Sequence, residues 1–356
     1  MYQRKLMRMD FSKAITIWYL ENKRDLPWRC TNDPYKIWIS EIILQQTRVA
    51  QGLSYYNRFI EHYPNVKDLA NATEDEVLKD WQGLGYYSRA RNLHFTAKCI
   101  MDKFEGVFPK TNEDVRSLKG IGDYTAAAIC SFAYNQPYAV VDGNVYRILS
   151  RVFEIYTPID SIEGKKEFSK LAQELLDPKE AALHNQAIMD LGAVVCTPES
   201  PHCEDCPLNE MCIAYTNRTF AKLPVKEKKT KQRDRFFYYF FIQNGDKTYL
   251  HKRGEKDIWK GLYEFPLIEK EEELTEEEVF RIKDGNELIE FSDLKIKKIN
   301  SSITHILSHQ RIHACFIECT ANFNKEKESK YVEISIDKID KYAVSRLTEL
   351  FLEKKR

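Results

Sequence analysis

The chain has 356 residues, of which 43% are hydrophobic and 12% aromatic, and its 54 basic side chains balance its 54 acidic ones. This length is enough for two or three domains with buried cores, and the composition excludes a disordered or low-complexity chain. No apolar run approaches the roughly 20 residues that a membrane helix requires. The N-terminus has no apolar stretch behind its basic residues, so we expect a cytoplasmic protein without a secretory signal or membrane association.

The two halves of the chain carry small and opposite net charges. Residues 1–220 carry a net charge of −3, and residues 221–356 carry a net charge of +3. Neither half is a polycation, so binding to DNA would depend on local patches and on backbone donors.

Residues 1–215 have helical character. The capping box at 73–76 (Thr-Glu-Asp-Glu) predicts a helix start, because the threonine and the last glutamate satisfy each other's backbone amides. Further helices are predicted over 112–119 and 124–134, and glycines and prolines punctuate the joins. We find no β-like alternation here, so this part is expected to be one all-helical domain.

The character changes after Tyr215. Residues 216–235 are rich in basic side chains and lack periodicity, which predicts a linker that could also touch phosphate. The remainder, 236–356, mixes strand and helix patterns and is expected to form a separate α/β domain. Residues 236–242 predict a strand, and 248–251 predict the strand that returns from a turn at Asn-Gly-Asp.

Later segments of this second domain are also patterned. Residues 313–320 and 331–336 predict strands, and 339–354 predict a terminal helix. Seven acidic residues within 269–278 are interpreted as the solvated face of a helix. The predicted fold class is therefore multidomain, with an all-helical domain followed by an α/β domain.

Four cysteines form a compact pattern. Cys196, Cys203, Cys206 and Cys212 have the spacing C-x6-C-x2-C-x5-C within 17 residues. Four thiolates suit either zinc or an iron–sulfur cluster. The usual zinc pattern has two C-x2-C pairs, so this spacing favours a cluster.

Two glycines one residue apart separate a predicted helix end from a helix start. Gly120 and Gly122 would let the backbone approach a ligand closely, and their amides with the following helix N-terminus form an anion site. One phosphate of a DNA backbone would fit. An ordinary helix–helix turn is the alternative.

Two carboxylates stand out by their surroundings. Glu41 lies in the apolar stretch 37–44, where desolvation would raise its pKa and let it act as a general acid. The alternative is that it lies on one exposed stripe of the helix.

Asp142 follows an apolar run and precedes a helix, which predicts an N-cap held rigidly and kept ionised by backbone amides. Such a carboxylate could face developing positive charge.

The segment 81–91 combines a glycine turn with aromatic and basic residues. Tyr86 could wedge between unstacked bases, and Arg89 and Arg91 could pair with phosphates. The alternative is a set of core aromatics with solvated arginines.

Together these motifs resemble the MutY-type adenine DNA glycosylases of the helix-hairpin-helix superfamily, which includes endonuclease III. The motifs of the helical part are Leu-Pro-Trp-Arg at 26–29, Ser-Glu-Ile-Ile-Leu-Gln-Gln-Thr-Arg-Val at 40–49, Gly-Leu-Gly-Tyr-Tyr-Ser-Arg-Ala-Arg at 83–91, Gly-Ile-Gly-Asp-Tyr-Thr-Ala at 120–126, Val-Asp-Gly-Asn-Val at 141–145, Asn-Gln-Ala-Ile-Met-Asp-Leu-Gly-Ala at 185–193 and the cysteine loop 196–212. Gly-Leu-Tyr-Glu-Phe-Pro at 261–266 and His-Ile-Leu-Ser-His-Gln at 305–310 resemble the family's Nudix-like recognition domain. The resemblance covers nearly the whole chain.

The resemblance implies a fold and a reaction. The fold is a helix-hairpin-helix glycosylase domain over 1–215 followed by a Nudix-like lesion-recognition domain over 236–356. The partner is duplex DNA with adenine opposite 8-oxoguanine or G, and we expect a monomer associated with the nucleoid. Adenine is flipped from the duplex and its N-glycosidic bond is hydrolysed in base excision repair.

The resemblance also assigns residues. Glu41 would protonate adenine at N7, and Asp142 would stabilise the sugar cation, with Tyr124 and Asn144 supporting the site around Asp142. Further DNA contacts would come from Arg29, Gln46, Thr47, Tyr86, Ser308 and His309. The four cysteines would hold a 4Fe-4S cluster that shapes a DNA-contacting loop. Bifunctional relatives carry a lysine where this chain has Tyr124, so a monofunctional enzyme is expected.

Three positions depart from the family pattern or carry no assignment. Leu307 stands where many members have Phe, and Gln186 stands where some have Glu, so we assign Gln186 no role. A working Nudix hydrolase needs a Glu six residues after its motif glycine, where this chain has Leu267, so no pyrophosphatase activity is expected. The alternatives are a bifunctional pyrimidine-damage or mismatch glycosylase-lyase of the same superfamily, and a non-catalytic iron–sulfur DNA-binding protein.

Overall fold

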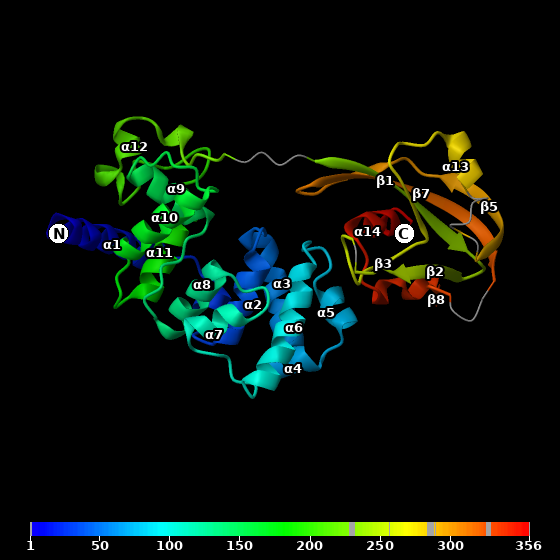
Figure 1. Cartoon of the computed structure of the whole chain (residues 1–356), viewed down its shortest axis with the longest axis horizontal. Coiled ribbons are helices and arrows are strands. Elements are labelled where there is room, and N and C mark those ends of the chain that lie inside the picture. Colours follow the sequence, from blue (N-terminus) through cyan, green and yellow to red (C-terminus); the bar gives the residue numbers. More distant parts are fainter. Residues whose placement is uncertain are drawn as a thin grey trace. The chain divides into compact units, whose positions relative to one another are not determined.

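The structure is a computed structural model that describes residues 2–227, 232–255, 257–282, 288, 290–324 and 329–355. The chain divides into two compact units, one made of residues 1–71 and 95–228 and the other of residues 72–94 and 229–356. Helices fill the first unit, whereas the second combines sheets with helices (Figure 1). The predicted fold class is thus confirmed. Residues 228–231 of the predicted linker lie outside the described residues.

The first unit is built from helices throughout its described residues. Their bounds are α1 (Tyr2–Asn22), η1 (Pro27–Arg29), α2 (Pro34–Leu44), α3 (Val49–His62), α4 (Val66–Asn71), α7 (Asn112–Ser117), α8 (Asp123–Tyr134), α9 (Gly143–Val152), α10 (Ile162–Leu175), α11 (Ala181–Val194), η2 (Asn209–Met211), α12 (Ile213–Thr216) and η3 (Phe220–Lys222). Helix α6 (Ser88–Lys103) begins in the second unit and continues into the first. Among the described residues, every helix is too short or too polar to cross a bilayer.

Polar side chains cap α2 and α9, two of the helices that carry the candidate site. The side chain of Asp33 accepts a hydrogen bond from the Tyr35 amide at the start of α2, and Asp142 caps α9 in the same manner. The capping box predicted at 73–76 is present at the start of α5 (Glu74–Asp80). Helix α7 ends at Ser117, two residues before the predicted end, because Leu118 is already extended.

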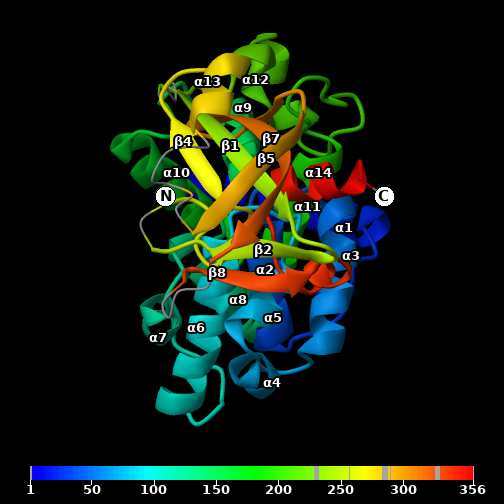
Figure 2. The same cartoon turned by 90° about the vertical axis from the view of Figure 1, so that its right-hand side faces the viewer.

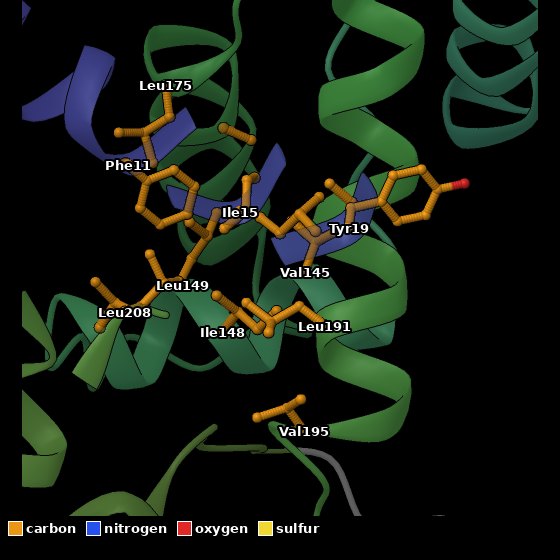
Figure 3. Close-up of a cluster of buried hydrophobic side chains, with 14 of the residues drawn as sticks. Phe11, Ile15, Tyr19, Val145, Ile148, Leu149, Leu175, Leu191, Val195 and Leu208 are labelled. Atoms are coloured by element: carbon orange, nitrogen blue, oxygen red, sulfur yellow. The ribbon is translucent and has the colours of Figure 1, made fainter. Parts of the chain in front are cut away.

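One hydrophobic core joins α1, α9, α10 and α11 (Figure 3). Phe11, Ile15 and Tyr19 are spaced four residues apart, so they form one stripe along α1. Ile148 and Leu149 of α9 pack into the same core and are almost completely buried. This packing fixes where α9 begins, and therefore where the residue that caps it must lie.

The described residues of the second unit form two sheets. Their strands are β1 (Arg233–Gln243), β2 (Lys247–Lys252), β3 (Tyr263–Glu264), β4 (Leu267–Lys270), β5 (Phe291–Ile299), β6 (Ile303–Ile306), β7 (Gln310–Phe323) and β8 (Tyr331–Ser335). The larger sheet has the order β4-β1-β7-β5 (Figure 2), with β6 also paired to β7. The smaller sheet has the order β3-β2-β8. Strands β1 and β7 run parallel to each other.

Strand β1 is buried on both faces. The odd-numbered residues from Phe237 to Phe241 join one hydrophobic cluster, and the even-numbered residues from Tyr238 to Ile242 join the other. Because side chains alternate along a strand, a run that is apolar at every position fits a central strand with cover on both sides.

The strand after the turn is present, but its predicted pairing is wrong. Strand β2 pairs with β3 and β8 instead of returning along β1. Both edges of β1 are already paired, one with β4 and the other with β7. The contact across the turn is limited to a bridge between Asn244 and Lys247.

The terminal helix is shorter than predicted. A 3-10 segment, η5 (Ile336–Lys341), precedes α14 (Arg346–Glu353), so the predicted helix over 339–354 is wrong in its first half. The carbonyl of Ala343 accepts a hydrogen bond from the Tyr263 amide of β3, which holds this stretch extended. Ser345 then caps α14 by accepting a hydrogen bond from the amide of Thr348.

The acidic segment 269–278 is only partly helical. Glu269 belongs to β4 and forms an ion pair with Arg235, whereas α13 (Glu276–Ile282) begins seven residues later. The acidic side chains of this segment are exposed, which agrees with the predicted solvation but not with a single helix face.

Residues 72–94 are hydrogen bonded within the second unit, although the sequence predicts that they belong with the helical part. Gln82 accepts a hydrogen bond from the Val344 amide at 3.1 Å and donates one to Glu349 at 3.2 Å. Asp75 accepts a hydrogen bond from the hydroxyl of Tyr263 at 2.9 Å. These contacts join the turn that carries Tyr86 to the α/β part of the chain.

Candidate active site

A cavity of about 430 Å³ lies in the first unit. Its wall comes from α2, α8, α9, α11, η1 and the turn after α2. The structure brings together on this wall seven of the residues predicted from the sequence, namely Arg29, Glu41, Gln46, Thr47, Tyr124, Asp142 and Asn144. Residues that are more than 100 positions apart in the chain therefore meet in one concave site.

Glu41 is buried on α2, with 6% of its surface exposed. The alternative, in which Glu41 lies on an exposed stripe of the helix, is therefore excluded. Burial raises the pKa of Glu41 to about 7, and the negative charge of Asp142 acts in the same direction. A hydrogen bond from the Tyr124 hydroxyl to Oε2 of Glu41, at 2.8 Å, and the charge of Arg29 act in the opposite direction. Near neutral pH this carboxyl can therefore hold or release a proton.

Asp142 caps α9 as predicted. Its Oδ1 accepts a hydrogen bond from the Val145 amide at 2.8 Å, and its Oδ2 accepts one from the Asn144 side chain at 2.8 Å. Burial raises the pKa of Asp142 above its ordinary value, while these hydrogen bonds and the charge of Arg147 lower it. The resemblance places both Asn144 and Tyr124 beside Asp142. Asn144 does bond it, whereas the hydroxyl of Tyr124 is directed to Glu41.

Arg147 supports this cap and was not predicted. Its guanidinium donates to Oδ1 of Asn144 at 2.7 Å, to the carbonyl of Gly192 at 2.6 Å and to the carbonyl of Cys196 at 2.6 Å. The side chain of Asn144 is therefore oriented from both ends, since its amide nitrogen donates to Asp142. In the sequence Arg147 is one basic residue of an amphipathic helix, so no local signal marks it.

Gly192 on α11 permits this arrangement. A Cβ atom at this position would lie 2.5 Å from Cβ of Asn144 and 3.2 Å from its Cα. Only a residue without a side chain allows α11 to approach the start of α9 so closely. A glycine inside a helix is a signal of close packing, although the sequence does not say against which residue.

Arg29 lies at the wall of the cavity in a buried ionic cluster that the sequence did not reveal. Its guanidinium donates to Oδ1 of Asp190 at 2.8 Å and to the hydroxyl of Tyr19 at 3.0 Å. Asp190 is completely buried and is also paired with Arg24. Gln186, to which no role was assigned, lines the cavity and accepts a hydrogen bond from Tyr19 at 2.9 Å. Because helix α1 lies far from α11 in sequence, only the fold shows this contact.

The turn after α2 is held in an unusual backbone conformation. Gln46 has φ of 58°, in the left-handed region, and it is followed by Thr47, which also lines the cavity. Non-glycine residues in this region are uncommon and cluster at functional sites.

The hairpin between α7 and α8 has the predicted form. Gly120 has φ of 82°, a conformation that glycine adopts without strain, and Gly122 occupies the N-cap position of α8. The amides at the start of α8 are therefore available at a helix N-terminus, where anions bind favourably.

The four cysteines line one apolar cavity in the first unit, bounded also by α9 and α11. None of the four forms a disulfide. The guanidinium of Arg151 lies 3.4 Å from Sγ of Cys196 and donates to the carbonyls of Thr197 and Pro198. In the part of the chain that the structure describes, no group of three His, Cys, Asp or Glu side chains has the geometry to hold a single metal ion.

The remaining predicted DNA contacts belong to the second unit. Tyr86 is about half exposed, has φ of 47°, and its hydroxyl lies 2.8 Å from Oγ of Ser308. Ser308 and His309 are exposed in the turn between β6 and β7. The structure therefore brings Tyr86 and Ser308 together across more than 200 residues of sequence.

Arg89 and Arg91 are engaged by backbone carbonyls. Arg89 is buried, with 9% of its surface exposed, and donates to the carbonyls of Leu84 and Gly85. Arg91 donates to the carbonyl of Lys260 at 2.7 Å. Burial lowers the pKa of the Arg89 guanidinium to about 10. In this arrangement Arg89 stabilises the glycine turn and does not present its charge to a phosphate, contrary to the prediction.

Comparisons with known proteins point to one activity. Residues 39–178 match the model of the HhH-GPD superfamily of base excision DNA repair proteins, and residues 238–354 match the NUDIX domain. An adenine DNA glycosylase of Buchnera aphidicola subsp. Baizongia pistaciae is 36% identical over 311 residues, which cover 85% of this chain and 84% of that protein. The adenine DNA glycosylase of Mus musculus is 44% identical over 214 residues, which cover 58% of this chain and 42% of that protein.

The helical part also matches solved structures. The structure of a thermostable thymine-DNA glycosylase superposes with a TM-score of 0.55 at 30% identity, and the match covers 59% of this chain and 97% of that one. The matched share of this chain agrees with the extent of its helical part.

Proposed function

Because this chain belongs to the adenine DNA glycosylase family, and is thus a DNA glycosylase of base excision repair, we propose that it removes adenine paired with 8-oxoguanine or G from duplex DNA by hydrolysis alone. The observation that carries the proposal is a pair of carboxyl groups, the buried Glu41 and the half-buried Asp142, on one cavity of about 430 Å³. Such a volume suits a single flipped base.

Glu41 is the general acid of this proposal. Tyr124 donates its hydrogen bond to Oε2 of Glu41, so Oε1 remains to carry the acid proton. Transfer of this proton to N7 of adenine makes the base a neutral leaving group. A pKa of about 7 suits the task, since an acid works best when its pKa lies near the operating pH.

Asp142 is the carboxylate that faces the sugar cation. The Val145 amide and the Asn144 side chain both donate to it, and hydrogen bonds of this kind favour the ionised form. As the C–N bond breaks, positive charge develops on the sugar, and a fixed carboxylate stabilises it before water adds. In this mechanism Glu41 acts in its protonated form and Asp142 in its ionised form, the two complementary states that glycoside cleavage requires.

Hydrolysis without strand cleavage follows from Tyr124. Lyase relatives carry a lysine at this place of the hairpin, whose amine attacks the sugar to form a Schiff base. A phenol whose pKa is raised well above 10 by burial and by the charge of Glu41 stays protonated. It therefore serves as a hydrogen-bond donor and not as a nucleophile.

Recognition of the opposite base is assigned to the second unit. Ser308 and His309 are exposed in the β6–β7 turn, where their side chains can bond an oxidised purine. Tyr86, hydrogen bonded to Ser308, is the aromatic wedge for the DNA stack. Ser308→Ala should lower the ratio of adenine excision opposite 8-oxoguanine to that opposite G, whereas Ser301→Ala at another exposed serine should not.

The cysteine cavity fits a 4Fe-4S cluster held by Cys196, Cys203, Cys206 and Cys212. Four free thiols on one small apolar cavity are a suitable donor set for such a cluster. When bound, the cluster supplies a rigid loop. Protein purified anaerobically should contain about four irons per chain. One zinc and no iron would contradict this assignment.

A panel of duplexes tests the function. Adenine is placed opposite 8-oxoguanine, G or T, and alkali reveals abasic sites after single-turnover incubation. Excision of adenine opposite 8-oxoguanine and G, with strand breaks only after alkali and no adduct trapped by borohydride, is expected. A borohydride-trapped covalent adduct would instead support a glycosylase-lyase, and a lack of excision on every duplex would leave only a DNA-binding role.

A further inference from the structure

We infer that Tyr19 is a positioning residue that fixes the amide of Gln186 with its NH₂ group toward the base, so that this wall of the cavity recognises a ring nitrogen of the purine. The inference rests on the proposed function, because it concerns the base held in the same cavity. Tyr19 itself is buried in the core and does not line the cavity, so it acts through other residues.

The hydrogen bonds of Tyr19 determine the direction of the amide. Arg29 lies 3.0 Å from the phenol oxygen of Tyr19, and a guanidinium can only donate, so this oxygen is the acceptor. The hydroxyl proton is then left for Gln186, whose nearest amide atom lies 2.9 Å away. In the structure this atom is Oε1, which accepts the hydroxyl proton.

The position of Tyr19 is fixed independently of Gln186. Its ring belongs to the same core as Phe11 and Ile15, and in Figure 3 the ring points away from the labelled aliphatic side chains with its oxygen at the far end. On the other side, Arg29 is held by Asp190, a completely buried carboxylate that Arg24 also contacts. A buried charge in this network is costly to disturb, so Arg29 keeps donating to Tyr19.

The NH₂ group of Gln186 is what remains for the cavity. Gln186 lines the cavity, and with Oε1 taken by Tyr19 its amide offers hydrogen-bond donors. Adenine has unprotonated ring nitrogens that accept hydrogen bonds, and these are the groups that a donor recognises. In the absence of the Tyr19 hydroxyl, the amide could rotate and offer either a donor or an acceptor.

Ring-nitrogen analogues test the inference. Single-turnover excision is measured on duplexes with adenine, 1-deazaadenine or 3-deazaadenine opposite 8-oxoguanine, where a C–H group replaces one acceptor. The parent should excise one of the two analogues more slowly than adenine. In Tyr19→Phe this penalty should fall about fivefold, equivalent to about 1 kcal/mol at 1.4 kcal/mol per tenfold change. The intrinsic reactivity of each base cancels in this comparison between proteins.

Two further variants separate positioning from general damage to the fold. Tyr35→Phe removes another buried hydroxyl of the same unit, one that donates to the carbonyl of Tyr63 and lies outside the cavity wall, and it should leave the penalty unchanged. In a Gln186→Ala background, Tyr19→Phe should have no further effect on the penalty, because its route to the base is already lost.

Different results would overturn the inference about Tyr19 and the proposed function. A penalty that stays within twofold of the parent in Tyr19→Phe, or that falls equally in Tyr35→Phe, would overturn the inference. The inference would also be overturned if Tyr19→Phe changed the penalty as much in the Gln186→Ala background as it does in the parent. If the parent does not excise adenine at all, the proposed function fails instead.

Discussion

The hydroxyl of Tyr124 donates a hydrogen bond to Oε2 of Glu41 at 2.8 Å, although the two residues are 83 positions apart in the chain. The contact joins the helix-hairpin-helix turn, which is the DNA-binding element of the proposed function, to the proposed acid. It also separates two effects on Glu41, since burial raises its pKa while this bond lowers it.

The proposed acid predicts the pH dependence of excision. Only protonated Glu41 can donate to adenine, and its pKa lies at about 7. The single-turnover rate should therefore fall as pH rises through about 7, with a tenfold loss for each further pH unit. The measurement uses saturating enzyme from pH 5.5 to 9, with DNA binding followed separately. A rate that stays level up to pH 9 would contradict the assignment of the acid.

In Tyr124→Phe, the fall of the excision rate with rising pH should move to higher pH. The hydrogen bond from Tyr124 stabilises the ionised form of Glu41, so its loss raises the pKa of the carboxyl. The variant should consequently keep a larger fraction of its own maximal rate at pH 8 than the parent does, even if that maximum is lower. If the fall of the rate moved to lower pH instead, the hydrogen bond from Tyr124 would be stabilising the protonated form of Glu41.

Neutral variants of the two carboxyls should abolish most of the reaction. Glu41→Gln cannot transfer a proton, and Asp142→Asn keeps the cap on α9 but removes the charge that faces the sugar. Single-turnover excision should fall at least 100-fold in each, given contributions of about 10²–10⁴ for general acids. Circular dichroism and binding to mispaired DNA should stay at parent levels. Near-parent excision by Glu41→Gln would place the acid elsewhere.

The Glu41→Gln variant should be more stable than the parent at alkaline pH. The folded pKa of Glu41 is raised from 4.5 to about 7, so between these values the folded chain binds more protons than the unfolded chain. The free energy of unfolding of the parent therefore falls as pH rises through this window. The advantage of Glu41→Gln should be about 2 kcal/mol larger at pH 8 than at pH 5, measured by urea unfolding. An equal advantage at both pH values would indicate an unshifted pKa.

Gly192→Ala should impair excision in spite of better helix propensity. Alanine in a helix is favoured over glycine by about 1 kcal/mol, yet its Cβ would lie 2.5 Å from Asn144. Asn144 must move, and Asp142 loses a hydrogen bond that orients it. We expect at least a tenfold loss of single-turnover rate. Gly254→Ala, where an added Cβ meets open space, is the matched control and should excise adenine at the parent rate.

The sequence alone predicted the elements whose causes are local. The capping box at 73–76, the cap at Asp142 and the two-part fold class depend on neighbouring residues and on short periodic patterns, and the structure has all three. The motifs also indicated the family, because residues that share a reaction keep their types and spacing. Local pattern failed at β2 and at the start of α14, where strand pairing with distant segments decided the outcome.

Only the tertiary structure decided which environment each side chain has. Glu41 could have been exposed or buried on the same helix, and Arg89 could have faced phosphate or the carbonyls of its own turn. The roles of Tyr19, Arg147 and Asp190 had no sequence signal, because their partners come from other helices. Burial, hydrogen bonding and pKa are properties of contacts between segments. Such contacts exist only once α1, α9 and α11 pack around one core and α2 lines the cavity beside them.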